Sequence, residues 1–288
     1  MDSPRIGVTG ATGSVGGRIA SRLAERGVAQ RLIVRDPSRA PNLPYAEVET
    51  AGYLDKQSMV SALSGIGTVF FVSAHGTEDR MRHHKAAVEA FAEAGVRRVV
   101  YTSFVGAAPD ATFTFARHHY HTEEHLKEAG LQVVALRDSF YMEILPQWVT
   151  EGVIRGPAGD GKFAPVARDD VADVAVSLLL DGDHPAGAYD VTGPSLVTMS
   201  DVARLISEAR GEQVEFVNET EEEAYASRTD IEASEFEVEA WVTSYLAIAR
   251  GEVEVVSDTV ERIAGHPPIS LREFLAAGSH DRFRRGSE

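Results

Sequence analysis

The sequence predicts an α/β fold in which a doubly wound parallel sheet is followed by a small C-terminal α/β lobe. Three observations predict it: short apolar runs alternate with helical patterns, three glycines mark the first strand-to-helix turn, and the alternation stops after Arg137. Apolar strands that alternate with helices are typical of a parallel sheet covered by helices on both faces. Such sheets bind ligands at the carboxyl ends of their strands, so we expect the functional residues there.

A glycine-rich turn joins the first strand to the first helix. Residues 5–9 predict the strand, and the periodic segment 18–26 predicts the helix. In this Rossmann-type unit Gly10 permits the turn, Gly13 lets the backbone approach a ligand, and Gly16 lets the helix pack on the strand. The free N–H groups at the start of the helix then point at an anion, which favours a pyrophosphate. An ordinary strand-to-helix turn is the alternative, but the position between a strand and an amphipathic helix favours a binding site.

The other elements follow from apolar runs and helical periodicity. Strands are predicted at 32–34, 68–72, 96–102 and 132–136, and helices at about 55–64, 78–94 and 115–129. The later segments are an aromatic stretch at 140–149, a turn-rich loop at 156–162, a helix at 169–181 capped by Asp169 or Asp170, strands at 188–192 and 214–217, a helix at 199–209 and acidic helices to about Arg250. We therefore expect a dinucleotide-binding domain over 1–150, a smaller lobe over 151–288 with some chain crossing back to the sheet, and a loose tail over 278–288.

Composition and charge exclude several classes of protein. The chain has 44 acidic and 28 basic residues, and this net charge of −16 repels the phosphates of nucleic acids and of anionic membranes. It contains no cysteine, which excludes disulfides, iron–sulfur clusters and thiolate metal sites. The first residues lead directly into a strand, and no apolar run approaches the roughly 18 residues of a membrane span. We expect a cytoplasmic protein, monomeric or homodimeric, that binds neither nucleic acid nor membrane and holds no metal.

The end of the second strand bears on the choice of dinucleotide. Units that bind NAD usually place Asp or Glu there to contact the adenosine ribose, whereas this strand ends in Arg35. A guanidinium suits the 2′-phosphate of NADP, and Arg39 is close enough in sequence to help. Asp36 follows directly and either points away or pairs with Arg35, so NADH stays a second candidate. We expect NADPH, with a solvated arginine at a strand end as the alternative interpretation.

Several short motifs occur in a fixed order along the chain. They are Val8–Gly13, Ile33–Pro37, Val100–Ser103, Leu136–Asp138 followed by Tyr141, Gly156–Lys162 and Ile263–Pro267. Together they resemble the NmrA-like atypical short-chain dehydrogenases over nearly the whole chain. The sequence is most similar to NADPH-dependent quinone reductases and next to triphenylmethane reductases. The resemblance implies a Rossmann domain with a small C-terminal lobe, and NADPH as hydride donor to a flat aromatic or quinone substrate.

The resemblance also implies roles for individual residues. The pyrophosphate is bound by Gly10, Ala11, Thr12, Gly13, Ser14 and Val15, and the adenosine phosphate by Arg35. Ser73 and Ala74 contact the ribose side, and Thr102 and Ser103 lie near the nicotinamide. Asp138 is a further cofactor-binding residue. Asp138 to Tyr141 face the nicotinamide and the substrate, with Tyr141 as a catalytic residue. His119 matches a histidine of the quinone reductases and is a catalytic candidate, as a proton source or a polar anchor; an exposed helix histidine is the alternative. Relatives often carry Asp after the third strand, where this chain has Gly52.

The chain lacks the usual machinery for carbonyl reduction. Short-chain dehydrogenases that reduce carbonyls use Tyr-x-x-x-Lys, in which the tyrosine donates a proton. Here Glu124 stands four residues after Tyr120, and its carboxylate would raise the pKa of that tyrosine. A quinone is already electrophilic and needs chiefly close stacking against the nicotinamide. The sequence therefore predicts an NADPH-dependent oxidoreductase that acts on quinones or similar conjugated acceptors.

Three alternatives stay open. NmrA-like proteins include redox sensors that bind NAD(P) without turnover and signal to a protein partner, and the missing lysine fits a sensor equally well. Residues 121–125 match the His-x-x-Glu-His signature of inverted zinc peptidases, although their place in a nucleotide-binding fold disfavours zinc. Four aromatic residues either line the substrate site or belong to the core: Phe104, Phe140, Tyr141 and Trp148.

Overall fold

The structure, a computed structural model, describes residues 6–229 and 231–278. The chain forms two compact units. The first comprises the residues up to Ser103 together with His118–Arg137 and Val171–Tyr189. The second comprises Phe104–Arg117, Asp138–Asp170 and the chain from Asp190 onward.

The first unit is built on a seven-stranded sheet whose strand order is β3-β2-β1-β4-β5-β6-β9. Its strands are β1 Ile6–Thr9, β2 Gln30–Val34, β3 Ala46–Thr50, β4 Thr68–Phe71, β5 Arg98–Phe104, β6 Gln132–Asp138 and β9 Gly187–Val191. The neighbouring pairs from β3 through β5 are parallel. The order reverses between β1 and β4, which is the switch point at which doubly wound sheets bind ligands. The predicted doubly wound fold is therefore confirmed.

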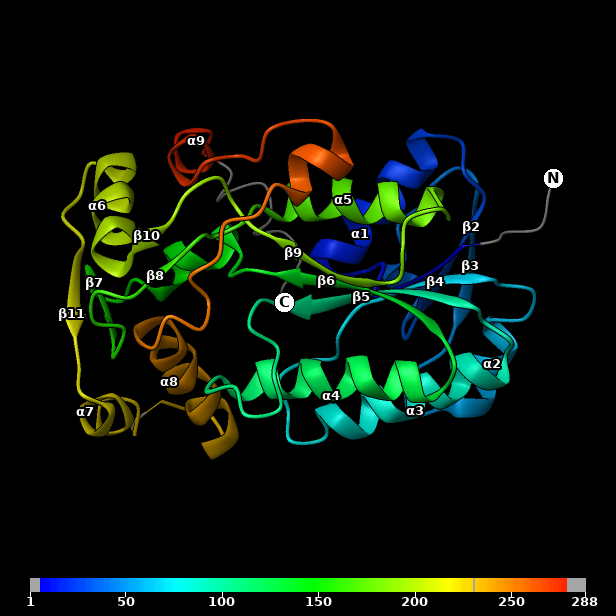
Figure 1. Cartoon of the computed structure of the whole chain (residues 1–288), viewed down its shortest axis with the longest axis horizontal. Helices are drawn as coiled ribbons and strands as arrows, with labels where there is room; N and C mark the ends of the chain where they lie inside the picture. The colour runs from blue at the N-terminus through cyan, green and yellow to red at the C-terminus, as the bar shows by residue number, and fades with distance from the viewer. Residues whose placement is uncertain (1–5, 230, 279–288) are drawn as a thin grey trace. The chain divides into compact units, whose positions relative to one another are not determined.

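Helices cover both faces of this sheet (Figure 1). They are α1 Ser14–Glu25, α2 Lys56–Ala62, α3 Arg80–Glu93, α4 Thr114–Glu128 and α5 Arg168–Leu180, with a short 3₁₀ turn η1 at Pro37–Arg39. Helices α1 and α5 lie on one face, joined by an ion pair of 2.7 Å between Arg22 and Asp173, and α2, α3 and α4 lie on the other. The face under α2 to α4 buries large side chains that include Met59, Phe71 and Phe91.

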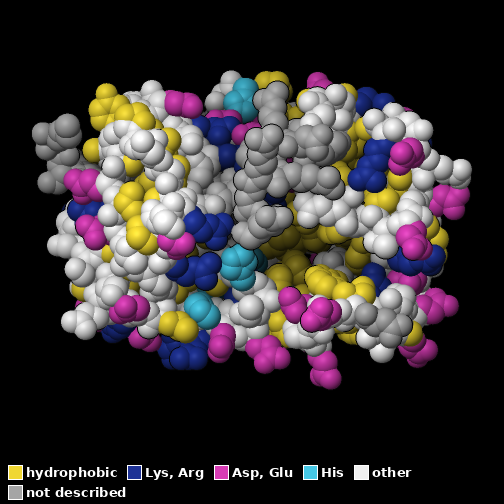
Figure 2. Space-filling model, turned by 180° about the vertical axis from the view of Figure 1, so that it is seen from behind, with side chains coloured by type: hydrophobic (Ala, Val, Ile, Leu, Met, Phe, Trp, Pro, Cys, Tyr) yellow, Lys and Arg dark blue, Asp and Glu magenta, His cyan; other side chains and the backbone are white. Residues whose placement is uncertain are grey.

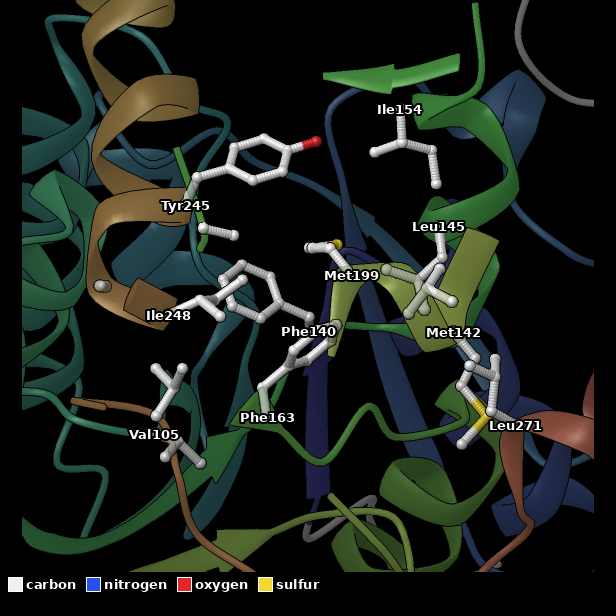
Figure 3. Close-up of a cluster of buried hydrophobic side chains, with 14 of the residues drawn as sticks. Val105, Phe140, Met142, Leu145, Ile154, Phe163, Met199, Tyr245, Ile248 and Leu271 are labelled. Atoms are coloured by element: carbon white, nitrogen blue, oxygen red, sulfur yellow. The ribbon is translucent and has the colours of Figure 1, made fainter. Parts of the chain in front are cut away.

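The second unit combines two small sheets with helices. Its elements are η2 Met142–Trp148, β7 Val153–Gly156, β8 Lys162–Phe163, β10 Val197–Thr198, α6 Met199–Arg210, β11 Glu215–Asn218, α7 Glu221–Ala226, α8 Glu235–Ala249, η3 Val260–Ala264 and α9 Leu271–Ala276. Strand β10 pairs with β8 in an antiparallel manner, and β11 pairs with β7 in a parallel manner. Figure 3 shows its core, in which Phe140, Phe163, Met199 and Ile248 converge and are almost fully buried.

Some local features differ from the sequence-based expectation. Strand β3 was implied by the family resemblance but not predicted from an apolar run, because it is an edge strand with four of its five residues exposed. Strand β7 was not expected, since Ile154 is its one fully buried apolar side chain. The expected cap of α5 is wrong: Asp169 and Asp170 lie inside the first turn of a helix that already begins at Arg168.

Charged side chains are spread over the face of the molecule that the space-filling view draws. Figure 2 shows Asp and Glu side chains scattered over one face, with Lys and Arg side chains among them. Within the described residues, no helix combines the length and the apolarity that crossing a membrane requires. Apart from Gly278, the tail that was expected to be loose lies outside the described residues.

Candidate functional site

The turn between β1 and α1 depends on glycine. Gly10 has φ +64°, and a Cβ at this position would lie 2.5 Å from Cγ1 of Val72. A Cβ at Gly16 would lie 2.3 Å from the carbonyl oxygen of Gly10. The N–H of Gly13 donates to that same oxygen over 2.9 Å and closes the turn. A side chain at Gly10 or Gly16 would thus displace the backbone that presents the start of α1.

The start of α1 is open to a ligand. Its N-cap residue Gly13 has no side chain to cap the helix, and the first turn contains no acidic residue. Thr12, Gly13 and Ser14 are exposed. A helix start combines unsatisfied N–H groups with a partial positive charge, so an anion is the ligand that fits it. The residues present therefore fit a dinucleotide pyrophosphate.

Arg35 follows β2 at the same edge of the sheet. It is exposed, and a Cβ on Gly52 would lie 3.8 Å from its Cγ, so a glycine there keeps a side chain away from it. Asp36 is occupied elsewhere: its Oδ1 accepts hydrogen bonds from the Ser38 N–H at 3.0 Å and the Ser38 hydroxyl at 2.6 Å. These bonds lower the pKa of Asp36. Within the described residues Arg35 forms no ion pair, which leaves its guanidinium for a phosphate.

Tyr53 ties together the ends of β1 and β4. Its hydroxyl donates to the carbonyl of Val72 over 2.6 Å and lies 2.9 Å from the hydroxyl of Thr9. Thr9 in turn donates to the carbonyl of Phe70 and accepts from the N–H of Val72. Burial raises the pKa of Tyr53, so the phenol stays protonated. This network fixes the backbone that enters the loop after β4.

Buried side chains hold the loop after β4. Thr102 accepts the N–H of Ser73 over 2.8 Å. Nε2 of His84 accepts the N–H of Ala74 over 2.9 Å, and Arg80 donates to the carbonyl of Ala74. Both backbone groups of Ala74 are therefore engaged by α3, which fixes the path of the chain at the carboxyl end of β4.

His119 belongs to the same buried network. Its Nε2 lies 2.9 Å from a guanidinium nitrogen of Arg80, and its Nδ1 lies 2.9 Å from the hydroxyl of Tyr101. Because a guanidinium can only donate, Nε2 is the accepting nitrogen and Nδ1 carries the hydrogen. Burial, and then the charge of Arg80, lower the pKa of His119 well below its usual value. The imidazole is thus held neutral, as is that of His84 for the same reasons.

Ser103 contacts a partly buried ion pair. Its hydroxyl donates to Oε1 of Glu123 over 2.5 Å. The same carboxylate accepts two hydrogen bonds from Arg137, at 3.0 and 2.7 Å. Thr102 and Ser103 are both almost fully buried. Their side chains therefore support the strand end from within the protein.

Asp138 and Tyr141 form a pair in the second unit. They lie 2.7 Å apart, between Oδ2 of the carboxyl and the phenolic oxygen. Asp138 is 1% exposed, and burial raises its pKa well above the usual value. The Arg168 guanidinium lies over the Tyr141 ring, with Cζ 4.8 Å from the ring centre. A buried acid thus stands directly behind a half-buried tyrosine at the carboxyl end of β6.

The remaining aromatic and helical candidates have structural roles. Phe104 and Phe140 lie in the core of the second unit with their rings 5.0 Å apart, which favours the core interpretation over a substrate wall. Trp148 is half-buried and packs against Phe140. Glu124 forms an ion pair of 2.7 Å with Lys127. Among the described residues no group of three or more His, Asp or Glu side chains is arranged to hold a metal, so His121 and His125 gain no third ligand.

The structure thus places the expected cofactor residues of the first unit at the carboxyl ends of β1, β2, β4 and β5. Asp138 and Tyr141 form a separate pair in the second unit. Sequence reasoning missed Tyr53, Arg80 and His84. A signal did exist for the last two, because they lie four residues apart on the face of α3 that also buries Ala87 and Val88.

Comparison with known proteins adds independent findings. Residues 10–182 match the family model described as NAD(P)H-binding. Quinone oxidoreductase 2 of Escherichia coli is 29% identical and matches over 94% of this chain and 97% of its own length. The NAD(P)H azoreductase of Xenophilus azovorans is also 29% identical, over 94% of this chain and 96% of its own.

Solved structures agree with the sequence matches. An NADPH-dependent quinone oxidoreductase from Escherichia coli, in complex with NADPH, has a TM-score of 0.86 at 28% identity, covering 95% of this chain and 99% of its own. The triphenylmethane reductase of a Citrobacter species, in complex with NADP(H), has a TM-score of 0.83 at 26% identity, with the same coverage of 95% and 99%.

Proposed function

The chain belongs to the NAD(P)H-binding family, in agreement with its resemblance to the NmrA-like dehydrogenases, and from this premise we propose that it is an NADPH-dependent oxidoreductase acting on quinones or similar conjugated acceptors. The observation that carries the proposal is the open start of α1, where glycines hold uncapped N–H groups at the switch point of the sheet. The names of the similar proteins support the substrate class, since they include a quinone oxidoreductase and an azoreductase.

Different residues bind different parts of the dinucleotide. Gly10 to Val15 hold the pyrophosphate with backbone N–H groups, and Arg35 binds the adenosine 2′-phosphate. Ser73 and Ala74 follow the ribose, on a loop that Thr102 and two side chains of α3 hold in place. Because Asp36 is engaged by Ser38, it does not neutralise Arg35, and this favours NADPH over NADH.

The chemistry asks little of the protein. Bound NADPH supplies the hydride, and the chain supplies orientation, exclusion of water and one proton for the reduced acceptor. Tyr141 is the residue we assign to that proton. His119 acts as a polar anchor, because its neutral ring is bonded to Arg80 and Tyr101 and has no proton to release near neutral pH.

A direct assay tests the proposal. Purified protein is mixed with NADPH and a small series of quinones, and the loss of nicotinamide absorbance is followed, with calorimetry to measure cofactor binding. Oxidation that saturates with the quinone is the expected result. Tight NADPH binding without oxidation by any acceptor would contradict an enzyme and support a redox sensor.

A further inference from the structure

We propose that Asp138 and Tyr141 form a proton relay, in which Tyr141 gives its phenolic proton to the reduced acceptor and Asp138 replaces it. The proposal rests on the proposed function and deepens it, because it separates acceptors that need a proton from acceptors that do not. Asp138 acts through Tyr141 and is therefore a positioning and supplying residue, whereas Tyr141 is the group that touches the acceptor.

The position and hydrogen bonding of the Asp138 carboxyl suit a proton donor. Its side chain ends β6, at the edge of the sheet where ligands bind. Oδ2 faces the Tyr141 hydroxyl at 2.7 Å, whereas Oδ1 is buried and has no hydrogen-bond partner among the described residues. The neighbouring Ser139 hydroxyl is likewise buried without a partner in that part of the chain. Buried polar atoms usually have a hydrogen-bond partner, so Oδ1 and the Ser139 hydroxyl are able to bond to a ligand or to a water molecule.

The environment of Asp138 disfavours the charged form of its carboxyl. Burial raises the pKa of Asp138, and no ion pair within the described chain compensates its charge. In the structure the Tyr141 hydroxyl donates to Oδ2 of Asp138. A protonated carboxyl can donate through Oδ2 in the reverse direction, to the phenolic oxygen of Tyr141. The phenolic O–H of Tyr141 then no longer donates to Asp138 and can donate to the acceptor. Burial raises the pKa of Tyr141 as well, so the phenol enters the reaction protonated.

Arg168 completes the relay. Its guanidinium lies over the ring of Tyr141, and its charge favours the phenolate that exists briefly after the proton has left. The backbone N–H of Arg168 donates to Glu143 over 3.1 Å, which fixes the start of α5 beneath the side chain. Arg168 makes no ion pair within residues 6–229 and 231–278, so its charge is available to the ring.

The step balances in atoms and charge. A quinone that receives a hydride gains two electrons and one hydrogen, and becomes a hydroquinone monoanion. The O–H bond of Tyr141 then breaks as an O–H bond forms on the anionic oxygen of the acceptor. The Oδ2–H bond of Asp138 breaks as the phenol of Tyr141 is restored, and water returns a proton to Asp138 after release of the product.

A cationic triarylmethane dye provides the matched control reaction. Its central carbon accepts a hydride and becomes a neutral C–H compound, so no proton is consumed. The relay therefore predicts that its loss slows quinone reduction much more than reduction of such a dye. Any residue whose role is only to hold the fold or the cofactor would slow both reactions together.

The test compares both acceptors in four variants. Tyr141→Phe and Asp138→Asn remove the relay, while Tyr225→Phe and Asp110→Asn make the same chemical changes at exposed positions. For the relay variants we expect the ratio of quinone turnover to dye turnover to fall by roughly 10²-fold, in the range that general acid catalysis supplies. The exposed controls keep the ratio of the wild type. Unchanged ratios in both relay variants would overturn the relay and leave the oxidoreductase intact.

A spectroscopic readout needs no turnover. Difference infrared spectra between the wild type and Asp138→Asn, recorded at neutral pH without cofactor, show the carbonyl band of a protonated carboxyl if Asp138 is the store. A carboxylate band in its place would overturn the proposal. If the wild type reduces neither acceptor, both the proposed function and the relay fail. Unchanged ratios with an active wild type, by contrast, overturn the relay alone.

Discussion

Some helices of this protein begin with a capping side chain, and others do not. In the second unit α6, α7, α8 and α9 each start with a capping box, in which a Ser or Thr and an acidic residue three positions later bond to each other's backbone. Helix α1 starts at Gly13, with neither a side-chain cap nor an acid in its first turn. Helix α3 also lacks a side-chain cap, yet its N-cap residue is the acidic Asp79.

The difference separates two uses of the same backbone groups. Every helix start leaves N–H groups without partners inside the helix. Where a capping box satisfies them, they stabilise the fold, typically by about 1 kcal/mol. Where glycine leaves them open in a chain with a net charge of −16, they stay available for an anionic ligand. Substitutions at the two kinds of start should therefore affect different measurements.

The largest effect is expected from Gly13→Asp, which turns the open start into a capped one. Asp favours N-cap positions, and Gly13 already has the extended backbone that such a cap needs. The new carboxylate would meet the cofactor phosphates, and unit charges about 4 Å apart repel by roughly 4 kcal/mol at a protein surface. We expect NADPH binding, measured by calorimetry, to weaken by about 10³-fold while the protein stays folded.

Gly13→Asn is the matched control for charge. It offers a capping side chain of the same shape without the negative charge, so the loss of NADPH affinity should be much smaller. A modest steric cost applies to both variants, because a Cβ at this position lies 3.3 Å from the carbonyl oxygen of Gly10. Equal losses in the two variants would contradict the electrostatic explanation of the open start.

Arg35→Gln tests the proposed contact between Arg35 and the adenosine 2′-phosphate of NADPH. A hydrogen bond to a charged group contributes about 1.5 to 3 kcal/mol, so NADPH affinity should fall roughly 10- to 150-fold. NADH has no 2′-phosphate, and its affinity should change little. Calorimetry with both nucleotides measures the ratio. A parallel loss for NADPH and NADH would show that Arg35 does not read the phosphate.

A fall in pH destabilises the two units through different titrating groups. His84 and His119 are held neutral in the first unit, so unfolding takes up protons and stability falls as the pH drops below their ordinary value of 6.5. The capping glutamates of the second unit titrate at lower pH. Hydrogen bonds lower the pKa values of Glu237 and Glu273, so the stability that these caps contribute is present above the ordinary value of 4.5 and is lost as the pH falls below it.

His84→Gln isolates the histidine contribution. Asp138 has a raised pKa and therefore acts in the opposite direction over part of the range, so the informative quantity is the difference between the wild type and this variant. Below about pH 6.5 the difference in unfolding free energy should shrink by about 1.4 kcal/mol per pH unit, as measured by denaturant titration. A difference that stays constant with pH would show that His84 titrates normally.

Local signals made the ligand-facing start predictable. The spacing of Gly10, Gly13 and Gly16 follows from short-range geometry, and the structure confirms the strand, turn and helix around them. The element β3 could not be predicted in the same way, since an edge strand that is mostly exposed needs no apolar pattern.

Long-range packing determined what the sequence could not reveal. Arg80 and His119 come from separate helices and meet only when α3 and α4 pack on one face of the sheet, so their contact has no signature in the sequence. The raised pKa of Asp138 likewise depends on burial, which the polar residue type does not suggest. Residue identity suggested candidate groups, and burial and neighbouring charges in the fold shift the pKa values of His119 and Asp138.

The smallest effect is expected from Thr198→Ala, which opens the capped start of α6. The Thr198 hydroxyl accepts the N–H of Asp201 over 3.1 Å, and Asp201 accepts the N–H of Thr198 in return. Removing the hydroxyl should lower the free energy of unfolding by about 1 kcal/mol in denaturant titrations. NADPH affinity should stay at the wild-type value, because this helix start holds the fold and no ligand. A loss of NADPH affinity without a loss of stability would invert the comparison, since it would place a ligand contact at the capped start of α6.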